Sequence, residues 1–103
     1  MWIFLSDAFF SIVDKGGDGS TLLVRARRAG DIEKVFPEAS VVMNGGTDYR
    51  YRARLPRELV ATRIAQAVKD TNYGNFKASV KDAKRRHTYS DVWETMYAYQ
   101  ELP

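Results

Sequence analysis

The chain has no cysteine among its 103 residues, only one histidine and only three prolines. Without cysteine it can form no disulfide, thiolate nucleophile or cysteine-ligated zinc site, and this composition is typical of a reducing compartment. The motifs H-E-x-x-H, D-x-D and G-x-S-x-G are also missing. We therefore expect no catalytic residue, no metal ligand and no cofactor.

Long apolar runs are missing as well. The most apolar stretch, "MWIFLSDAFFSIV", is interrupted by Asp7 and is shorter than the roughly 20 residues that a membrane-spanning helix needs. It has neither the basic start nor the small-residue cleavage site of a secretory signal. We expect a buried β-hairpin here, no contact with a membrane, and a cytoplasmic location.

The composition is that of an ordinary globular protein, with 45% hydrophobic and 28% charged residues. A chain of this length is too short to bury two separate cores, so we expect a single domain over residues 1–103. Thirteen aromatic residues predict a bulky core, so we expect a folded chain and not a disordered one.

Alternating and helical patterns together predict an α+β fold. We expect a sheet of four to five antiparallel strands with two to three helices on one face. Strand, helix, hairpin and helix over residues 21–69 form most of a ferredoxin-like motif.

Asp31, Asn75 and Thr88 occupy positions suited to helix N-caps, with Thr88 and Asp91 forming a capping box. The strands are expected over 2–5, 8–13, 21–27, 40–44 and 49–55, with a turn at 45–48, and the helices over 30–38, 56–70 and 88–102, with a short basic segment at 76–86.

Arginine occupies every second position of "DYRYRARLP", residues 48–56. Side chains alternate across a strand, so these arginines share one face, while Tyr49, Tyr51, Ala53 and Leu55 would face the helices. Residues 21–57 carry eight basic and four acidic side chains, so the excess positive charge of the chain lies here. If the strand over 21–27 lies in the same sheet, Arg25 and Arg27 join this face. The candidate binding residues here are Arg25, Arg27, Arg50, Arg52 and Arg54.

Two interpretations of this arginine face remain open. In one, it is a solvated sheet surface whose arginine stems cover apolar neighbours and discourage edge pairing. In the other, it binds phosphate or an acidic protein surface, for which the planar guanidinium is well suited. The predicted strands contain no internal Asp or Glu that would neutralise it.

A second basic cluster, in "KDAKRRHTY", adds Lys84, Arg85 and Arg86 to the candidate binding residues. These side chains could contact a nucleic-acid backbone. Alternatively, they are the cations that favour the C-terminal end of a helix dipole.

The last predicted helix carries Trp93, Met96 and Tyr97 at helical spacing. This stripe predicts a core face or, if it is exposed, a surface for a homodimer or another protein. A metal-dependent nuclease around Asp7 and Asp14, placed at one end of a hairpin, is the weakest of the functional hypotheses.

The stretches "DAFFSIV", "LLVRARRAGDIEKVFP", "DYRYRARLP", "NYGNFKASV" and "RRHTYSDVWETMY" resemble a family of short uncharacterised proteins from bacteria and their phages. The resemblance implies no activity or site residue; it implies a mobile-element context in which small proteins often act by binding. The sequence thus predicts a non-enzymatic binding module whose arginine face engages nucleic acid, a nucleoprotein or an acidic protein. The alternative is an inhibitor, for example of the anti-CRISPR type, or a subunit that docks through its aromatic C-terminal helix.

Overall fold

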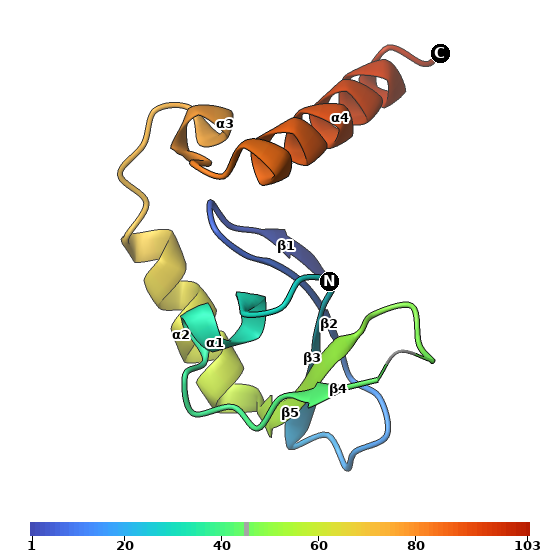
Figure 1. The fold of residues 1–103 in the computed structure, drawn as a ribbon, viewed down its shortest axis with the longest axis vertical. Coiled ribbons are helices and arrows are strands. Elements are labelled where there is room, and N and C mark those ends of the chain that lie inside the picture. Colours follow the sequence, from blue (N-terminus) through green and yellow to red (C-terminus); the bar gives the residue numbers. More distant parts are fainter. Residues whose placement is uncertain (45) are drawn as a thin grey trace. The chain divides into compact units, whose positions relative to one another are not determined.

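Five antiparallel strands form one sheet in the first of two units into which the chain divides, residues 1–71 and 72–103 (Figure 1). The computed structural model describes residues 1–44 and 46–103. The chain divides into two units, so the single domain expected from the sequence stays a prediction. The strands are β1 (Trp2–Phe4), β2 (Phe9–Val13), β3 (Thr21–Ala26), β4 (Val42–Met43) and β5 (Tyr51–Pro56), and the helices are α1 (Asp31–Val35), α2 (Arg57–Lys69), α3 (Phe76–Ser79) and α4 (Ala83–Gln100).

The strand order is β1-β2-β3-β5-β4, so β5 lies between two strands that precede it in the chain. The antiparallel pairs β3–β5 and β5–β4 make β3 and β4 parallel, with α1 in the connection between them. This is the split arrangement that the sequence suggested over residues 21–69, with β2 as the further neighbour of β3. The prediction of an α+β fold with an antiparallel sheet is confirmed. The predicted turn at 45–48 includes Gly45, which lies outside the described residues.

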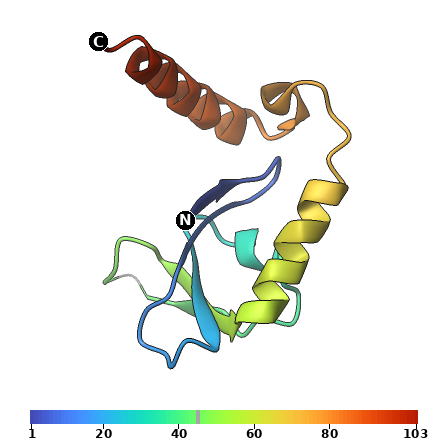
Figure 2. The ribbon, with the colours of Figure 1, turned by 180° about the vertical axis from the view of Figure 1, so that it is seen from behind.

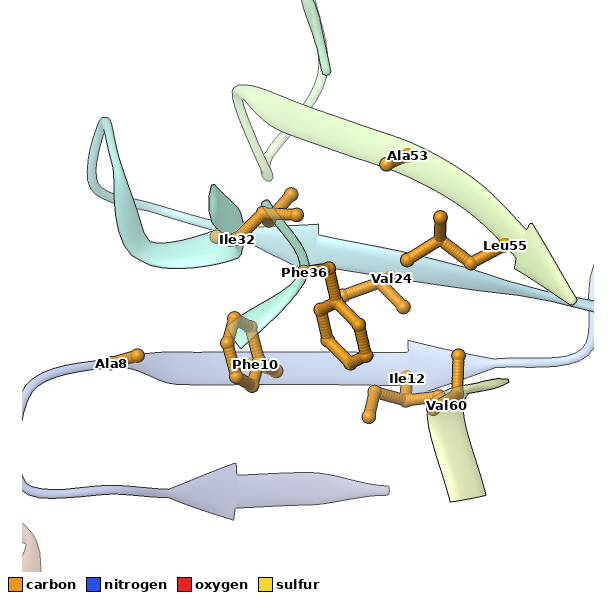
Figure 3. Close-up of a cluster of buried hydrophobic side chains, with 10 residues drawn as sticks. Ala8, Phe10, Ile12, Val24, Ile32, Phe36, Ala53, Leu55 and Val60 are labelled. Atoms are coloured by element: carbon orange, nitrogen blue, oxygen red, sulfur yellow. The ribbon is translucent and has the colours of Figure 1, made fainter. Parts of the chain in front are cut away.

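The hydrophobic core lies between one face of the sheet and helices α1 and α2 (Figures 2 and 3). Ile32 of α1 and Phe36 at its C-cap are fully buried, and the Phe36 ring lies 5.9 Å from the ring of Phe10 of β2. Val60 adds the contribution of α2. Val68, near the end of α2, is 70% exposed, so the buried stripe of this helix does not extend to it. Helices α1 and α2 both lie on the core face of the sheet, so no described helix of the first unit covers its opposite face.

Asp31 is buried, but it does not cap α1 as predicted. The N-cap is Gly30, whose φ of 89° is in the left-handed region that glycine adopts without strain. Asp31 is instead the first helical residue, and its carboxylate accepts a hydrogen bond of 3.0 Å from the backbone amide of Phe9. The carboxylate therefore ties the start of β2 to α1.

In the second unit the N-cap of α4 lies six residues earlier than the sequence predicted. Asp82 is its N-cap and accepts a hydrogen bond from the amide of Arg85 at 2.8 Å, so Thr88 lies inside the helix. Asn75 caps α3 as expected, accepting from the amide of Ala78 at 3.0 Å. No helix in the described residues combines the length and the apolar character needed to cross a membrane.

Candidate functional site

The face of the sheet opposite α1 and α2 carries a row of side chains that crosses all five strands. The register pairs Trp2 with Ser11, Ser11 with Arg25, Arg25 with Arg52, and Arg52 with Val42. Residues paired in this way share one side of an antiparallel sheet. Phe10 and Ile12 point into the core, so Ser11 and its row face the other way.

Arginine dominates the β3–β5 part of this row. Arg25 and Arg52 are directly opposite one another, and such a pair of like charges is unfavourable in a sheet. Arg54, two residues along β5, lies opposite Leu23 on the same side. This register places Arg25, Arg52 and Arg54 together on the face away from the helices. Alternation in the sequence predicts the same placement.

Tyr49 lies among these arginines, contrary to the prediction that it would face the helices. The guanidinium carbon of Arg27 is 4.0 Å from the centre of its ring, and that of Arg25 is 4.6 Å away. Only 4% of Tyr49 is exposed. The reason is that β5 begins at Tyr51, so residue 49 lies in the turn before the strand, where strict alternation does not apply. Tyr49 thus holds two arginines in fixed positions.

The hydrogen bonds of the arginine face go mainly to neutral acceptors. Arg25 donates to the Ser11 hydroxyl at 2.7 Å, and Arg27 donates to the carbonyl of Asp48 at 2.8 Å. Arg52 donates to the carbonyl of Tyr49 at 3.3 Å. Its Nη2 is also 3.9 Å from the carboxylate of Asp48, which is the one ion pair of these arginines within the described chain. Neutral acceptors satisfy donors without cancelling charge, so the face remains strongly positive.

Arg54 turns toward the glycine-rich loop at residues 14–20. Its Nη2 donates to the carbonyl of Lys15 at 2.7 Å, and its Nη1 donates to the Thr21 hydroxyl at 3.3 Å. A Cβ on Gly17 would lie 3.0 Å from Arg54 and 2.8 Å from Thr21, so a larger residue there would displace the guanidinium. Part of the role of Arg54 is therefore structural. The side chain of Arg50, by contrast, is exposed.

Aromatic side chains occupy the β1–β2 part of the same face. Trp2 is 66% exposed and packs edge-on against Phe9, with ring centres 6.0 Å apart. Phe4 packs on Phe9 at 4.6 Å. The sequence placed these residues in a buried hairpin and gave no sign that Trp2 would share a face with the arginines. That relation follows from the strand order, which the sequence does not encode locally.

The second basic cluster belongs to the other unit and lies in the first turns of α4, not at the C-terminal end of a helix. Arg86 donates to the carbonyl of Val80 at 3.0 Å, and Arg85 donates to the Tyr89 hydroxyl at 3.2 Å. The dipole interpretation of this cluster is therefore wrong, since the N-terminal end of a helix disfavours cations. An open hollow between α3 and α4 is lined by Lys77, Ala78, Ala83, Arg86, His87 and Ser90.

The geometry does not support the nuclease hypothesis. Asp7 precedes β2 and Asp14 follows it, so they lie at opposite ends of the strand rather than at one end of a hairpin. At about 3.3 Å per residue that places their backbones roughly 20 Å apart. Asp14 is also paired with Arg57 at 2.8 Å. Across residues 1–44 and 46–103, no group of three acidic or histidine side chains is arranged to hold a metal ion.

Comparisons with protein-family models, with curated proteins and with solved structures each found no match. The resemblance to bacterial and phage proteins stays a prediction.

Proposed function

We propose that the protein is a non-enzymatic binding module whose arginine face, formed by Arg25, Arg27, Arg50, Arg52 and Arg54, binds nucleic acid. One observation carries the proposal: the guanidinium groups of Arg25, Arg27, Arg52 and Arg54 accumulate on and beside one sheet face, with a single carboxylate within 4 Å of them in the described chain. Arg50 adds an exposed cation just before β5. A surface with uncancelled positive charge attracts polyanions and releases their counterions on binding.

A purely structural role explains this face less well. The Nε of Arg25 is buried and has no hydrogen-bond partner among the described residues, which costs about 1–3 kcal/mol. The opposed pair of Arg25 and Arg52 adds like-charge repulsion. A neutral side chain of similar length would cover Ser11 and Tyr49 without either cost. Binding of an anion offsets the like-charge repulsion, because it supplies the missing negative charge.

Single-stranded nucleic acid fits this face better than a duplex or an acidic protein. Exposed Trp2 provides a ring on which a base can stack, on the same side as the arginines. Proteins that bind single strands combine such rings with a basic surface along the backbone, at about 1–3 kcal/mol per stacked base. An acidic protein would use the arginines but would leave Trp2 without a role.

The test measures the affinity for labelled single-stranded and duplex oligonucleotides of mixed sequence over a range of salt concentrations. With five phosphate contacts, the logarithm of the association constant should fall with the logarithm of salt with a slope of about −3.5 for a single strand. Replacing both Arg27 and Arg50 with Gln should reduce that slope by about 1.4, since each lost contact removes about 0.7. Both residues are exposed, so the fold should survive.

Lys69→Gln is the matched control, because Lys69 is exposed at the end of α2, in the helix layer on the other face of the sheet. It removes charge of the same sign and should leave the slope unchanged. Equal slopes for the wild type and the Arg27/Arg50 variant would refute the proposal. Tight binding to an acidic protein but not to single strands would refute the choice of nucleic acid.

The exposed aromatic residues of α4 favour docking on a protein as a second candidate function. Trp93, Met96 and Tyr97 are each more than half exposed, so the prediction that they form a core face is not met. Trp, Tyr and Met are common in protein interfaces.

A further inference from the structure

The open hollow between α3 and α4, within the second unit, has two walls that an aromatic contact holds together. It is lined by Lys77, Ala78, Ala83, Arg86, His87 and Ser90. The four positions on α4 follow the i, i+3, i+4, i+7 spacing of one helix face, and the other two belong to α3. Phe76 of α3 stacks on the buried ring of Tyr89 of α4, with ring centres 5.6 Å apart. This stacking fixes the two walls relative to one another.

Two cations of the lining are held in place by neutral groups. The Nζ atom of Lys77 lies 4.0 Å from the centre of the Trp93 ring. The Nη1 atom of Arg86 donates a hydrogen bond of 3.0 Å to the carbonyl of Val80, which is fully buried. Within residues 1–44 and 46–103, no carboxylate lies within 4 Å of either charged group. A ring face and a carbonyl orient a cation without cancelling its charge, so both charges remain available to a ligand.

The other polar groups of the lining also suit an anion. Ser90 contributes a hydroxyl and His87 an imidazole, and both groups can donate a hydrogen bond. The described residues that line the hollow include no Asp or Glu. Their one ion pair joins His87, when it is protonated, to Asp91 at 3.9 Å, and both side chains are well exposed. A long, exposed pair of this kind contributes little, so the lining keeps its net positive charge.

The N-terminal end of α4 is not what forms this site. The carboxylate of the N-cap Asp82 accepts a hydrogen bond from the amide of Arg85 and places a negative charge at the helix end. The guanidinium of Arg85 donates to the Tyr89 hydroxyl, and neither Arg85 nor Lys84 lines the hollow. Of the basic cluster expected from the sequence, only Arg86 belongs to the lining. Side chains from two helices therefore define the site, and not backbone amides.

We propose that this hollow binds a phosphate group. A phosphate has several acceptor oxygens around one atom, and it can accept from the ammonium, the guanidinium, the imidazole and the hydroxyl of the lining at once. A carboxylate offers only two oxygens in one plane and would leave more of these donors unserved. The volume of the hollow, about 470 Å³, is in the range of sites for small ligands. The site belongs to the second unit and does not depend on the arginine face of the first.

The test titrates the ¹⁵N-labelled full chain with inorganic phosphate at constant ionic strength and follows the backbone amide resonances. Saturable shifts should concentrate at residues 77–78 and 83–90. Lys77→Gln and Arg86→Gln should each weaken binding by about ten-fold or more, because a hydrogen bond from a charged donor is lost. Lys81→Gln is the matched control, because it removes an exposed charge between the two helices, outside the lining. It should change the affinity by less than about two-fold, since solvent and salt screen that charge.

Trp93 provides a second test, because its ring positions the ammonium of Lys77. Trp93→Phe keeps a ring face and should retain most of the affinity, whereas Trp93→Leu should weaken phosphate binding by about two- to five-fold. In the Lys77→Gln background, Trp93→Leu should have no further effect. A general loss of packing would weaken binding in both backgrounds and would overturn the positioning role.

Two further ligands identify the source of the phosphate. A 5′-mononucleotide that shifts the same amides indicates a free phosphate ester, and an oligonucleotide without a terminal phosphate that shifts them at lower concentration indicates a nucleic-acid backbone. The Arg27/Arg50 variant should bind inorganic phosphate in the hollow as the wild type does, which separates this site from the arginine face. Shifts that do not saturate, shifts that lie only outside the lining, or equal affinity of the wild type and both lining variants would each overturn the proposal.

Discussion

The contact of Tyr49 with two arginines allows a graded test of what orders the candidate binding face. Tyr49 is 4% exposed, with Arg27 and Arg25 at 4.0 and 4.6 Å from its ring. Three substitutions remove different parts of this arrangement. Tyr49→Phe keeps the ring, Tyr49→Leu keeps much of the apolar volume but no aromatic face, and Tyr49→Ala removes nearly the whole side chain.

The expected losses in the free energy of unfolding differ enough to be resolved. Each cation–π contact contributes about 0.5–1 kcal/mol near a surface, so Tyr49→Leu should cost about 1–2 kcal/mol for the two arginines. Tyr49→Ala should cost about 3–5 kcal/mol, as for other buried aromatic side chains. Tyr49→Phe should cost less than about 1 kcal/mol, because both arginines contact the ring.

Urea denaturation, followed by circular dichroism, measures these losses, with the slope of the transition checked for constancy. A double-mutant cycle between Tyr49→Leu and Arg27→Met separates the ring–guanidinium contact from general packing. If Tyr49→Leu is as stable as Tyr49→Phe and the cycle shows no coupling, the ring does not hold the arginines. Affinity for single strands should follow the same order, because released arginines must be ordered again on binding.

Three further predictions concern the first unit. Asp31→Ala should destabilise the fold by about 1.5–3 kcal/mol in urea denaturation, because a backbone amide loses a charged acceptor, while Asp31→Asn keeps an acceptor oxygen and should lose less. Gly17→Ala should lower the melting temperature by displacing Arg54, and Arg54→Ala combined with it should show less than additive loss. A backbone hydrogen bond, and then Arg63, lower the pKa of Glu38. The ionised carboxylate therefore stabilises the fold at pH values above the usual pKa of glutamate. That stabilisation is lost as the pH falls through the lowered pKa. Glu38→Gln should flatten this part of the acid limb of a pH titration of stability, and an unchanged limb would contradict the assignment.

The parts of the fold that follow local periodicity could be predicted from the sequence. The strand near residues 51–55 follows from alternation, and the helix after Pro56 follows from its apolar spacing. Tyr49 was misplaced because alternation holds only while the chain stays in the strand, and the start of β5 depends on its pairing with β3 and β4. A two-residue strand such as β4 carries almost no periodic signal of its own.

The start of α4 could not be predicted from local signals because the sequence offers two acceptable caps. Thr88 and Asp91 form a plausible capping box, yet Asp82 caps the helix six residues earlier. Both positions satisfy the same local chemistry, so the choice depends on how the chain leaves α3. The consequence for function is large, because the earlier start moves Lys84, Arg85 and Arg86 from the end of one helix to the beginning of another.

The shared face of Trp2 and the arginines shows which part of a site lies beyond sequence patterns. Residues 2, 11, 25, 52 and 42 form one row because five strands pair in the order β1-β2-β3-β5-β4. Periodicity assigns each residue to a face of its own strand, but it does not say which strands are neighbours. The positive charge of the site was therefore visible in the sequence, whereas its aromatic component was not. The proposed preference for single strands depends on that second component, and Trp2→Ala should reduce single-strand affinity while leaving the slope of salt dependence unchanged.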